Sequence, residues 1–289
     1  MYRILITFCS IVLQLHASTL VTSILNSVGD VTLYTDNAGV LSVESASNAV
    51  DPYLSNTTLQ GTASSAGGNI ELGRSLDNYT DMSSTGAFAS ASTTILTTTH
   101  STGDTVTVRG LNGADWFTTG AGLYDTSYGA DNLANQYFND LYNAGYNAAN
   151  LFGKLAITQM DATSLYEQFR DAGGFAQVSD PNISYVTVEN GQVTVGLAGF
   201  VDTTPRLAQL TGYTEDTLNS LLTNGFQSSE VAMINGEAVY SFSGVSSGTV
   251  LDDGVDSYAA TYEVALPVPE PSSALLALLG TLTLLRRSR

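Results

Sequence analysis

The stretch ISYVTVENGQVTVGL, residues 183–197, decides the fold that we expect for this chain. Two runs rich in β-branched residues, Ile183–Val188 and Val193–Leu197, have the composition of β-strands. The pair Asn190-Gly191 between them suits the tight turn of a β-hairpin, because both central residues of that turn need a positive φ. The sequence therefore predicts an antiparallel hairpin at this place.

Helix signals lie on both sides of this hairpin. Before it, residues 131–152 repeat leucine, tyrosine and alanine on one helical face and asparagine on the opposite face, at steps of three and four. A second helix is expected at Ser164–Asp171, which has a capping-box pattern at its start and glycines after its end. After the hairpin, Thr204 and Thr214 are expected to cap two further helices.

Further strands are expected in both halves of the chain. Hairpins are expected at residues 28–43 and 231–242, and single strands at Thr105–Arg109 and Tyr258–Leu266. Residues 55–70, which are rich in serine, threonine and glycine, are expected to form a loop. The order strands, helices, hairpin, helices, hairpin, strand predicts an α+β fold instead of alternating βαβ units.

The charge of the chain excludes nucleic acid as a partner. Only 12% of the 289 residues are charged, and the net charge is −18. Residues 24–266 hold 26 acidic side chains against five basic ones. Such a chain is repelled by phosphate backbones and attracts divalent cations. The acidity on its own indicates no more than a soluble exported protein.

The first 23 residues have the features of a signal peptide. Arg3 supplies a positive charge, and Ile4–Leu15 is an apolar run too short to span a bilayer, which needs about 20 residues. Small residues follow, and cleavage after Ala17 and cleavage after Ser23 both fit. Cys9 is the only cysteine and lies in this run, so we expect the mature chain to have no disulfide and no cysteine-bound metal.

Three features follow one another at the C-terminus. A tripeptide with two prolines, which favours extended chain, comes first: Pro269, Glu270 and Pro271. The apolar run Ala274–Leu285, which partitions into a bilayer, comes second. A basic end, which stays on the cytoplasmic side by the positive-inside rule, comes last: Arg286, Arg287 and Arg289.

These residues, together with Ser272-Ser273 and with Gly280 inside the apolar run, resemble the PEP-CTERM sorting domain of Gram-negative bacteria. The resemblance covers Pro267–Arg289. It implies export through the Sec machinery and anchoring by a short C-terminal transmembrane helix. It also implies processing by an exosortase, which releases the protein to the cell surface or the extracellular matrix, and a place in the exopolysaccharide layer of a biofilm.

The chain divides into four expected segments. These are a signal peptide at 1–23, a Ser/Thr-rich and β-rich region at 24–130, an α+β region at 131–266, and a sorting and anchor segment at 267–289. For the last segment, a permanent tail anchor without processing is the alternative interpretation.

Residues for catalysis are scarce in the expected mature chain. His100 is its only histidine and Lys154 its only lysine. Neither lies in a pattern that indicates a Ser-His-Asp triad, a two-histidine metal site or a Ser-x-x-Lys nucleophile. Two carboxylates could still serve a glycosidase, but no pair stands out. We therefore expect a protein that is not an enzyme and needs no cofactor.

One acidic cluster is a candidate calcium site. Asp252, Asp253 and Asp256 lie around Gly254 and offer the oxygen ligands that calcium prefers. The cluster lacks the ligand frame and the distal glutamate of an EF-hand. A solvated acidic turn is the alternative interpretation.

The polar face of the expected helix at 131–152 is a candidate sugar site. Its amides and aromatic rings are the groups that bind sugars. The candidate residues are Asn139, Tyr142, Asn143 and Tyr146. A plain hydrophilic helix face is the alternative.

Together these features predict an exported cell-surface or extracellular-matrix protein with a structural role. A carbohydrate- or calcium-dependent binding module is the second hypothesis, and an enzyme of unknown type is the third.

Overall fold

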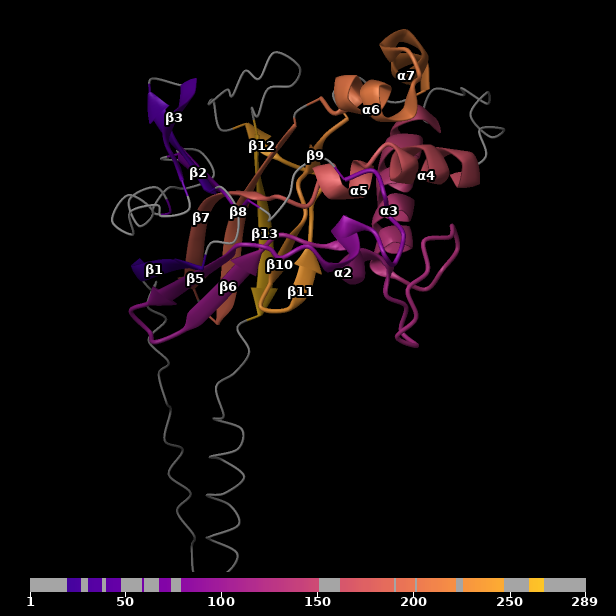
Figure 1. Cartoon of the computed structure of the whole chain (residues 1–289). Coiled ribbons are helices and arrows are strands. Elements are labelled where there is room, and N and C mark those ends of the chain that lie inside the picture. Colours follow the sequence, from indigo (N-terminus) through magenta and orange to yellow (C-terminus); the bar gives the residue numbers. More distant parts are fainter. Residues whose placement is uncertain are drawn as a thin grey trace, which may run out of the picture.

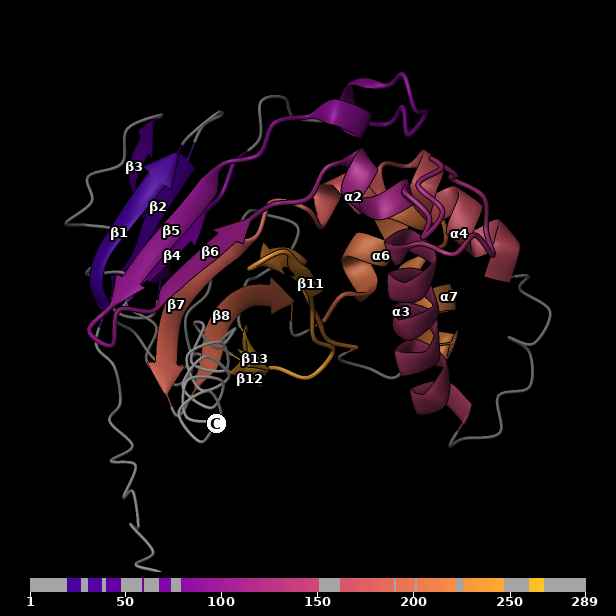
Figure 2. The same ribbon diagram turned by 90° about the horizontal axis from the view of Figure 1, so that it is seen from below.

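Two antiparallel β-sheets stack face to face on one side of the molecule, and helices gather on the other side (Figure 1 and Figure 2). The element order confirms the expected α+β class, with strands predominating. The computed structural model describes residues 20–26, 31–37, 40–47, 59, 68–73, 79–150, 162–189, 191–200, 202–221, 226–246 and 260–267.

The larger sheet has eight strands, in the order β12-β13-β8-β7-β4-β2-β3, with β9 pairing with β8. The neighbouring strands run antiparallel to one another. The strands are β2 (Val31–Asn37), β3 (Val40–Ser47), β4 (Gly68–Glu71), β7 (Asn182–Glu189), β8 (Gln192–Phe200), β9 (Ser228–Ser229), β12 (Val245–Ser246) and β13 (Ala260–Pro267).

The smaller sheet has five strands, in the order β1-β5-β6-β10-β11. They are β1 (Leu20–Asn26), β5 (Ile95–His100), β6 (Thr105–Arg109), β10 (Ala232–Ile234) and β11 (Glu237–Val239). The helices are the short 3-10 helix η1 (Ala87–Ser90), α2 (Gly113–Phe117), α3 (Leu133–Asn150), α4 (Ala162–Asp171), α5 (Gly174–Gln177), α6 (Thr204–Thr211) and α7 (Glu215–Leu221).

The hairpin predicted at residues 183–197 is confirmed and lies inside the larger sheet as β7 and β8. The Tyr185 ring crosses Gly196 on β8, where an added Cβ would come within 2.3 Å of a ring carbon. Its hydroxyl then donates to Oε1 of Glu263 on β13, at 2.6 Å. Three strands are thereby tied together by one side chain.

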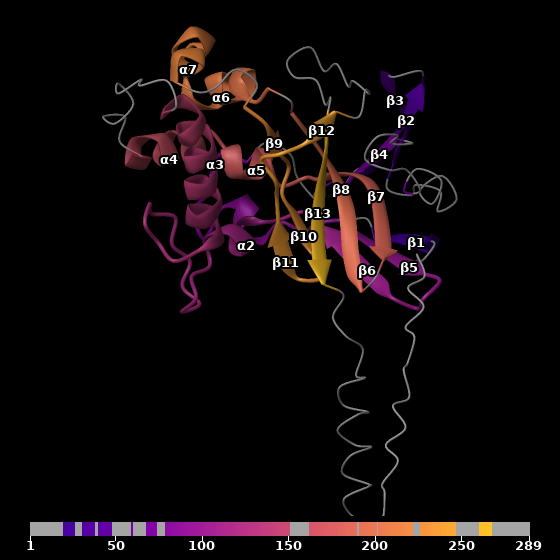
Figure 3. The same ribbon diagram turned by 180° about the vertical axis from the view of Figure 1, so that it is seen from behind.

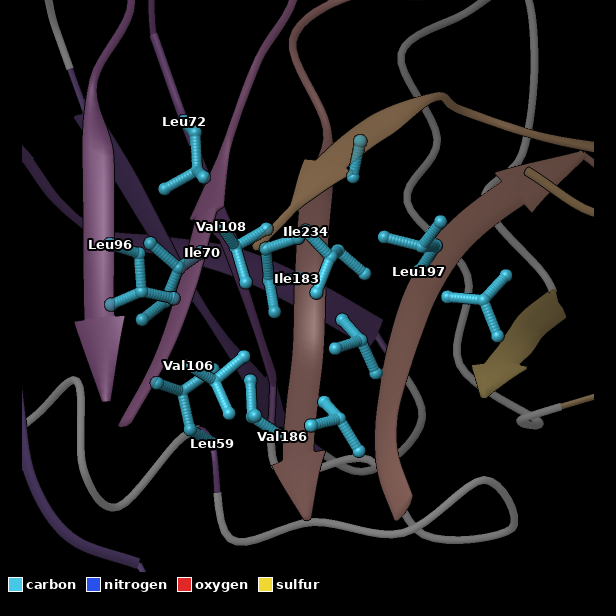
Figure 4. Packing of buried hydrophobic residues seen from close by; sticks show 14 of the residues in the cluster. Leu59, Ile70, Leu72, Leu96, Val106, Val108, Ile183, Val186, Leu197 and Ile234 are labelled. Carbon is cyan, nitrogen blue, oxygen red and sulfur yellow. The ribbon is translucent and has the colours of Figure 1, made fainter. Parts of the chain in front are cut away.

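Aliphatic side chains from both sheets fill the space between them (Figure 4). Ile70, Ile183 and Leu197 from the larger sheet meet Leu96 and Val108 from the smaller one, and each of them is fully buried. Burying a side chain of this size stabilises the fold by about 1.5–3 kcal/mol. This dry layer holds the two sheets in their stacked arrangement.

An aromatic core joins the helices to the end of the sheets. The Trp116 ring lies 5.4 Å from that of Tyr137 and 5.1 Å from that of Phe175, centroid to centroid. Its Nε1 donates to Oγ of Ser179 at 2.7 Å, so the buried indole is satisfied. These contacts link α2, α3 and α5.

Local turn and cap signals predict several boundaries correctly. The hairpin at 231–242 is confirmed as β10 and β11, with φ of 51° at Asn235 and 88° at Gly236. Thr214 caps α7 as expected, because its Oγ1 accepts from the Thr217 amide at 3.2 Å. For α6 the predicted cap is wrong by one residue, since Thr203 holds that position and Thr204 begins the helix.

The prediction of a loop at residues 55–70 is wrong at its C-terminal end, because β4 begins at Gly68. Gly68 has a φ of 140°, and an added Cβ would lie 2.0 Å from the Tyr34 carbonyl oxygen. The strand has only four residues and pairs with β2 and β7, which come from distant parts of the chain. A strand this short carries no period of its own.

Strands from both sides of residue 131 share the two sheets. In the larger sheet β4 pairs with β7, and in the smaller one β6 pairs with β10. Among the described residues, none of the helices has the length and apolar character needed to cross a bilayer. The residues after Pro267, for which a sorting and anchor role is expected, lie outside the described residues, as do residues 1–19.

Candidate functional site

The predicted site residues fall into two groups. Those of the sorting motif, the basic end and the acidic cluster lie outside the described residues: Pro269, Glu270, Pro271, Arg286, Arg287, Arg289, Asp252, Asp253 and Asp256. In the described remainder of the chain, no three histidine, cysteine or acidic side chains come together as metal ligands.

The predicted sugar residues lie on α3. Asn139 and Asn143 are exposed, and Tyr142 is half-buried. The Tyr142 ring stacks on that of Phe138, with centroids 6.4 Å apart and an interplanar angle of 23°. The side chain of Tyr146 lies outside the described part. Of the four residues, the two asparagines therefore offer amides to solvent, while Tyr142 contributes to packing.

The asparagine stripe is not a uniformly solvated face, which corrects the prediction for its first turn. Asn135 is only 4% exposed, and its Oδ1 accepts from the Gly129 amide at 2.6 Å. Its Nδ2 donates to the Ser127 carbonyl at 3.0 Å. Asn132 caps the helix, because its Oδ1 accepts from the Asn135 amide at 3.1 Å. These amides hold the preceding loop against α3.

A polar groove is lined by residues of α3, of β11 and the segment after it, and of β13. Figure 3 shows the ribbons of α3, β11 and β13 near one another on this side of the molecule. Its volume is about 300 Å³, at the lower end of the range for small-molecule sites. The residues that line it are Gln136, Ala238, Val239, Tyr240, Ser241, Glu263, Val264 and Ala265. We call it the α3–β13 groove.

Tyr240 forms one wall of the α3–β13 groove. Its ring packs edge-on against Tyr137, with centroids 5.0 Å apart, and its hydroxyl donates to Oδ2 of Asp140 at 2.6 Å. Burial, and then the hydrogen bond to Asp140, raise the pKa of Tyr240 above its ordinary value. The hydroxyl therefore stays protonated at neutral pH and keeps the Asp140 carboxylate in place.

Glu263 lines the groove from β13. It is exposed, and its Oε1 accepts from the Tyr185 hydroxyl at 2.6 Å. Desolvation and this hydrogen bond raise the pKa of Tyr185, which therefore remains a donor. A tyrosine hydroxyl thus donates to one oxygen of each of these carboxylates. Glu263 also lines the groove, and its exposed carboxylate can accept from a ligand through Oε2.

The edge of β13 also contributes to the groove. On that side β12 pairs only with Ala260 and Thr261. Among the described strands, none continues this pairing along Glu263–Ala265. Backbone donors and acceptors at a strand edge can bind a ligand that carries hydroxyl groups.

A second depression, of about 600 Å³, lies between α4 and α6. Glu167, Gln168, Asp171 and Gln209 are among its lining residues. The Asp171 carboxylate accepts from Nε of Arg170 at 2.7 Å. Its lining includes no aromatic ring, so we regard the α3–β13 groove as the better candidate for a binding site.

His100 lies inside the fold and away from either hollow. It is 2% exposed, and its Nε2 lies 3.1 Å from Oγ1 of Thr98. Burial lowers the pKa of His100, while the nearby Asp104 raises it by a smaller amount. The imidazole is therefore neutral at pH 7 and is part of the buried interior.

Three groove residues were not predicted from the sequence: Gln136, Tyr240 and Glu263. Gln136 could have been found, because it precedes Asn143 by seven residues, which is two helical turns on the same face. Tyr240 and Glu263 had no such signal. Tyr240 meets Asp140 across 100 residues of chain, and no local pattern encodes that contact.

Comparison with protein-family models, with curated proteins and with solved structures gave no match. We therefore infer function from the residues themselves.

Proposed function

We propose that this chain is an exported cell-surface or extracellular-matrix protein of a Gram-negative bacterium, sorted by a PEP-CTERM signal. Its role is structural, within the exopolysaccharide layer. The observation that carries this proposal is the order of features at the C-terminus: Pro269-Glu270-Pro271, an apolar run, and Arg286-Arg287.

Features of the described fold are compatible with this proposal. β13 pairs with β8 along its whole length and ends at Pro267. The sorting motif therefore follows the last paired residue and does not interrupt the sheet. The low share of charged residues and the strong net negative charge also suit a protein that works outside the cell.

The test is the intact mass and location of the protein in its native host. We expect it in the extracellular or surface fraction, without its first residues and without Leu276–Arg289. Deleting the exosortase should leave a cell-associated form that retains those C-terminal residues. Peptides from Leu276–Arg289 in the released protein would reject the release step, and a cytoplasmic location would reject export altogether.

The α3–β13 groove favours a second function, namely carbohydrate binding. It combines an amide at Gln136, a tyrosine ring and hydroxyl at Tyr240, and a carboxylate at Glu263. Hydrogen-bonding groups beside an aromatic ring are the usual means of binding sugars. Such a site would attach the protein to the polysaccharide around it. Titration of the purified chain with oligosaccharides tests this function directly.

A further inference from the structure

The second proposed function can be specified by ligand class. We propose that the α3–β13 groove binds uncharged polysaccharide chains and rejects acidic ones. This inference rests on the proposed carbohydrate binding by the groove. The charged side chains in and around the groove determine which class of carbohydrate fits.

Among the described residues, the lining of the groove holds a carboxylate and no cation. Glu263 supplies that carboxylate, and Tyr240, another lining residue, donates from its hydroxyl to the carboxylate of Asp140. A uronic acid or a sulfated sugar would bring a negative charge next to these carboxylates. Like charges in such proximity cost binding free energy unless a cation lies between them.

The described basic side chains contact other parts of the fold. Arg109 donates to both carboxylate oxygens of Asp115, each at 2.7 Å. Arg170 donates to Asp171 and to the Thr126 carbonyl. None of the described arginines lines the groove, so an acidic sugar would find no partner among them.

The groups that remain suit neutral hydroxyls. The Gln136 amide both donates and accepts, and the Glu263 carboxylate accepts from sugar O–H groups. On the side of β13 where no described strand continues the pairing, its edge adds backbone groups at Glu263–Ala265. A neutral hexose chain can satisfy these groups without burying a charge of its own.

The experiment is a calorimetric titration of the full-length chain, kept in a mild detergent, with three probes: maltohexaose, cellohexaose and hexagalacturonate. The groove variant is Gln136→Ala with Glu263→Gln. The glutamine at 263 can still accept from Tyr185, and Gln136 is an exposed helical residue, so the fold is preserved. The control is Gln177→Ala with Glu189→Gln, an exposed helical glutamine and an exposed strand glutamate that line neither hollow.

We expect at least one neutral probe to bind, hexagalacturonate to bind at least ten-fold more weakly, and the groove variant to lose at least ten-fold in affinity for the neutral probe. The control should bind like the unmodified chain. Equal or tighter binding of hexagalacturonate would overturn the proposal, as would equal losses in the two variants or no binding of either neutral probe. Because these titrations do not depend on where the cell places the protein, their failure would leave the export proposal standing.

Discussion

At the scale of single residues, His100 makes the fold sensitive to pH. Burial lowers its pKa in the folded chain, whereas in the unfolded chain it titrates near its ordinary value of 6.5. The unfolded state therefore binds more protons as the pH falls through and below 6.5, and stability decreases in that window. We expect the midpoint of urea unfolding to fall between pH 7 and pH 5.

The control for this effect is His100→Gln, which keeps a polar side chain but does not titrate. This variant is expected to be less stable at pH 7 and to show a smaller change with pH. A pH dependence as steep as that of the unmodified chain would assign the effect to the carboxylates instead.

Gly196 is a position at which an added Cβ atom should lower the stability of the fold. In Gly196→Ala the new Cβ would meet the Tyr185 ring at 2.3 Å, and the ring would have to leave Glu263. Overpacking of this kind costs about 1–3 kcal/mol. Tyr185→Phe keeps the ring and removes only the hydrogen bond, which contributes about 0.5–1.5 kcal/mol, or more because the acceptor is charged. Chemical denaturation should show a larger decrease in the free energy of unfolding for Gly196→Ala than for Tyr185→Phe. The reverse order would contradict the packing argument.

At the scale of elements, β1 allows a choice between the two cleavage sites of the proposed signal peptide. β1 pairs with β5 from Leu20 to Asn26, with Ser23 opposite Thr98. Cleavage after Ser23 would remove the first part of this edge strand, whereas cleavage after Ala17 leaves it whole. We therefore expect the exported protein to begin at Ser18. N-terminal sequencing of the protein from its host checks this, and a chain that begins at Ile24 would show that β1 is dispensable.

At the scale of the whole molecule, the net charge of −18 governs the response to divalent cations. We expect calcium and magnesium to raise the melting temperature by similar amounts, because both screen the same excess of carboxylates. Replacing Asp252, Asp253 and Asp256 by asparagine should change this response little. A calcium-selective rise that disappears in the triple variant would instead establish a site, by mass action on the folded state.

The local elements of this protein could be predicted from short stretches of its chain. Strand composition and the turn pairs Asn190-Gly191 and Asn235-Gly236 predicted the two hairpins, because a tight turn depends on two adjacent residues. The helix at 131–152 followed from a period that its own residues carry. The expected export and sorting signals are likewise linear patterns.

The order of the strands and the place where a ligand could bind depend on contacts between segments that are far apart in the chain. β4 lies between β2 and β7, although a four-residue strand between glycine-rich stretches shows no pattern of its own. The α3–β13 groove exists because Gln136, Tyr240 and Glu263 meet when the helices pack against the end of the two sheets. Such contacts arise from the burial of apolar surface, which is non-directional, so no short stretch of sequence specifies them.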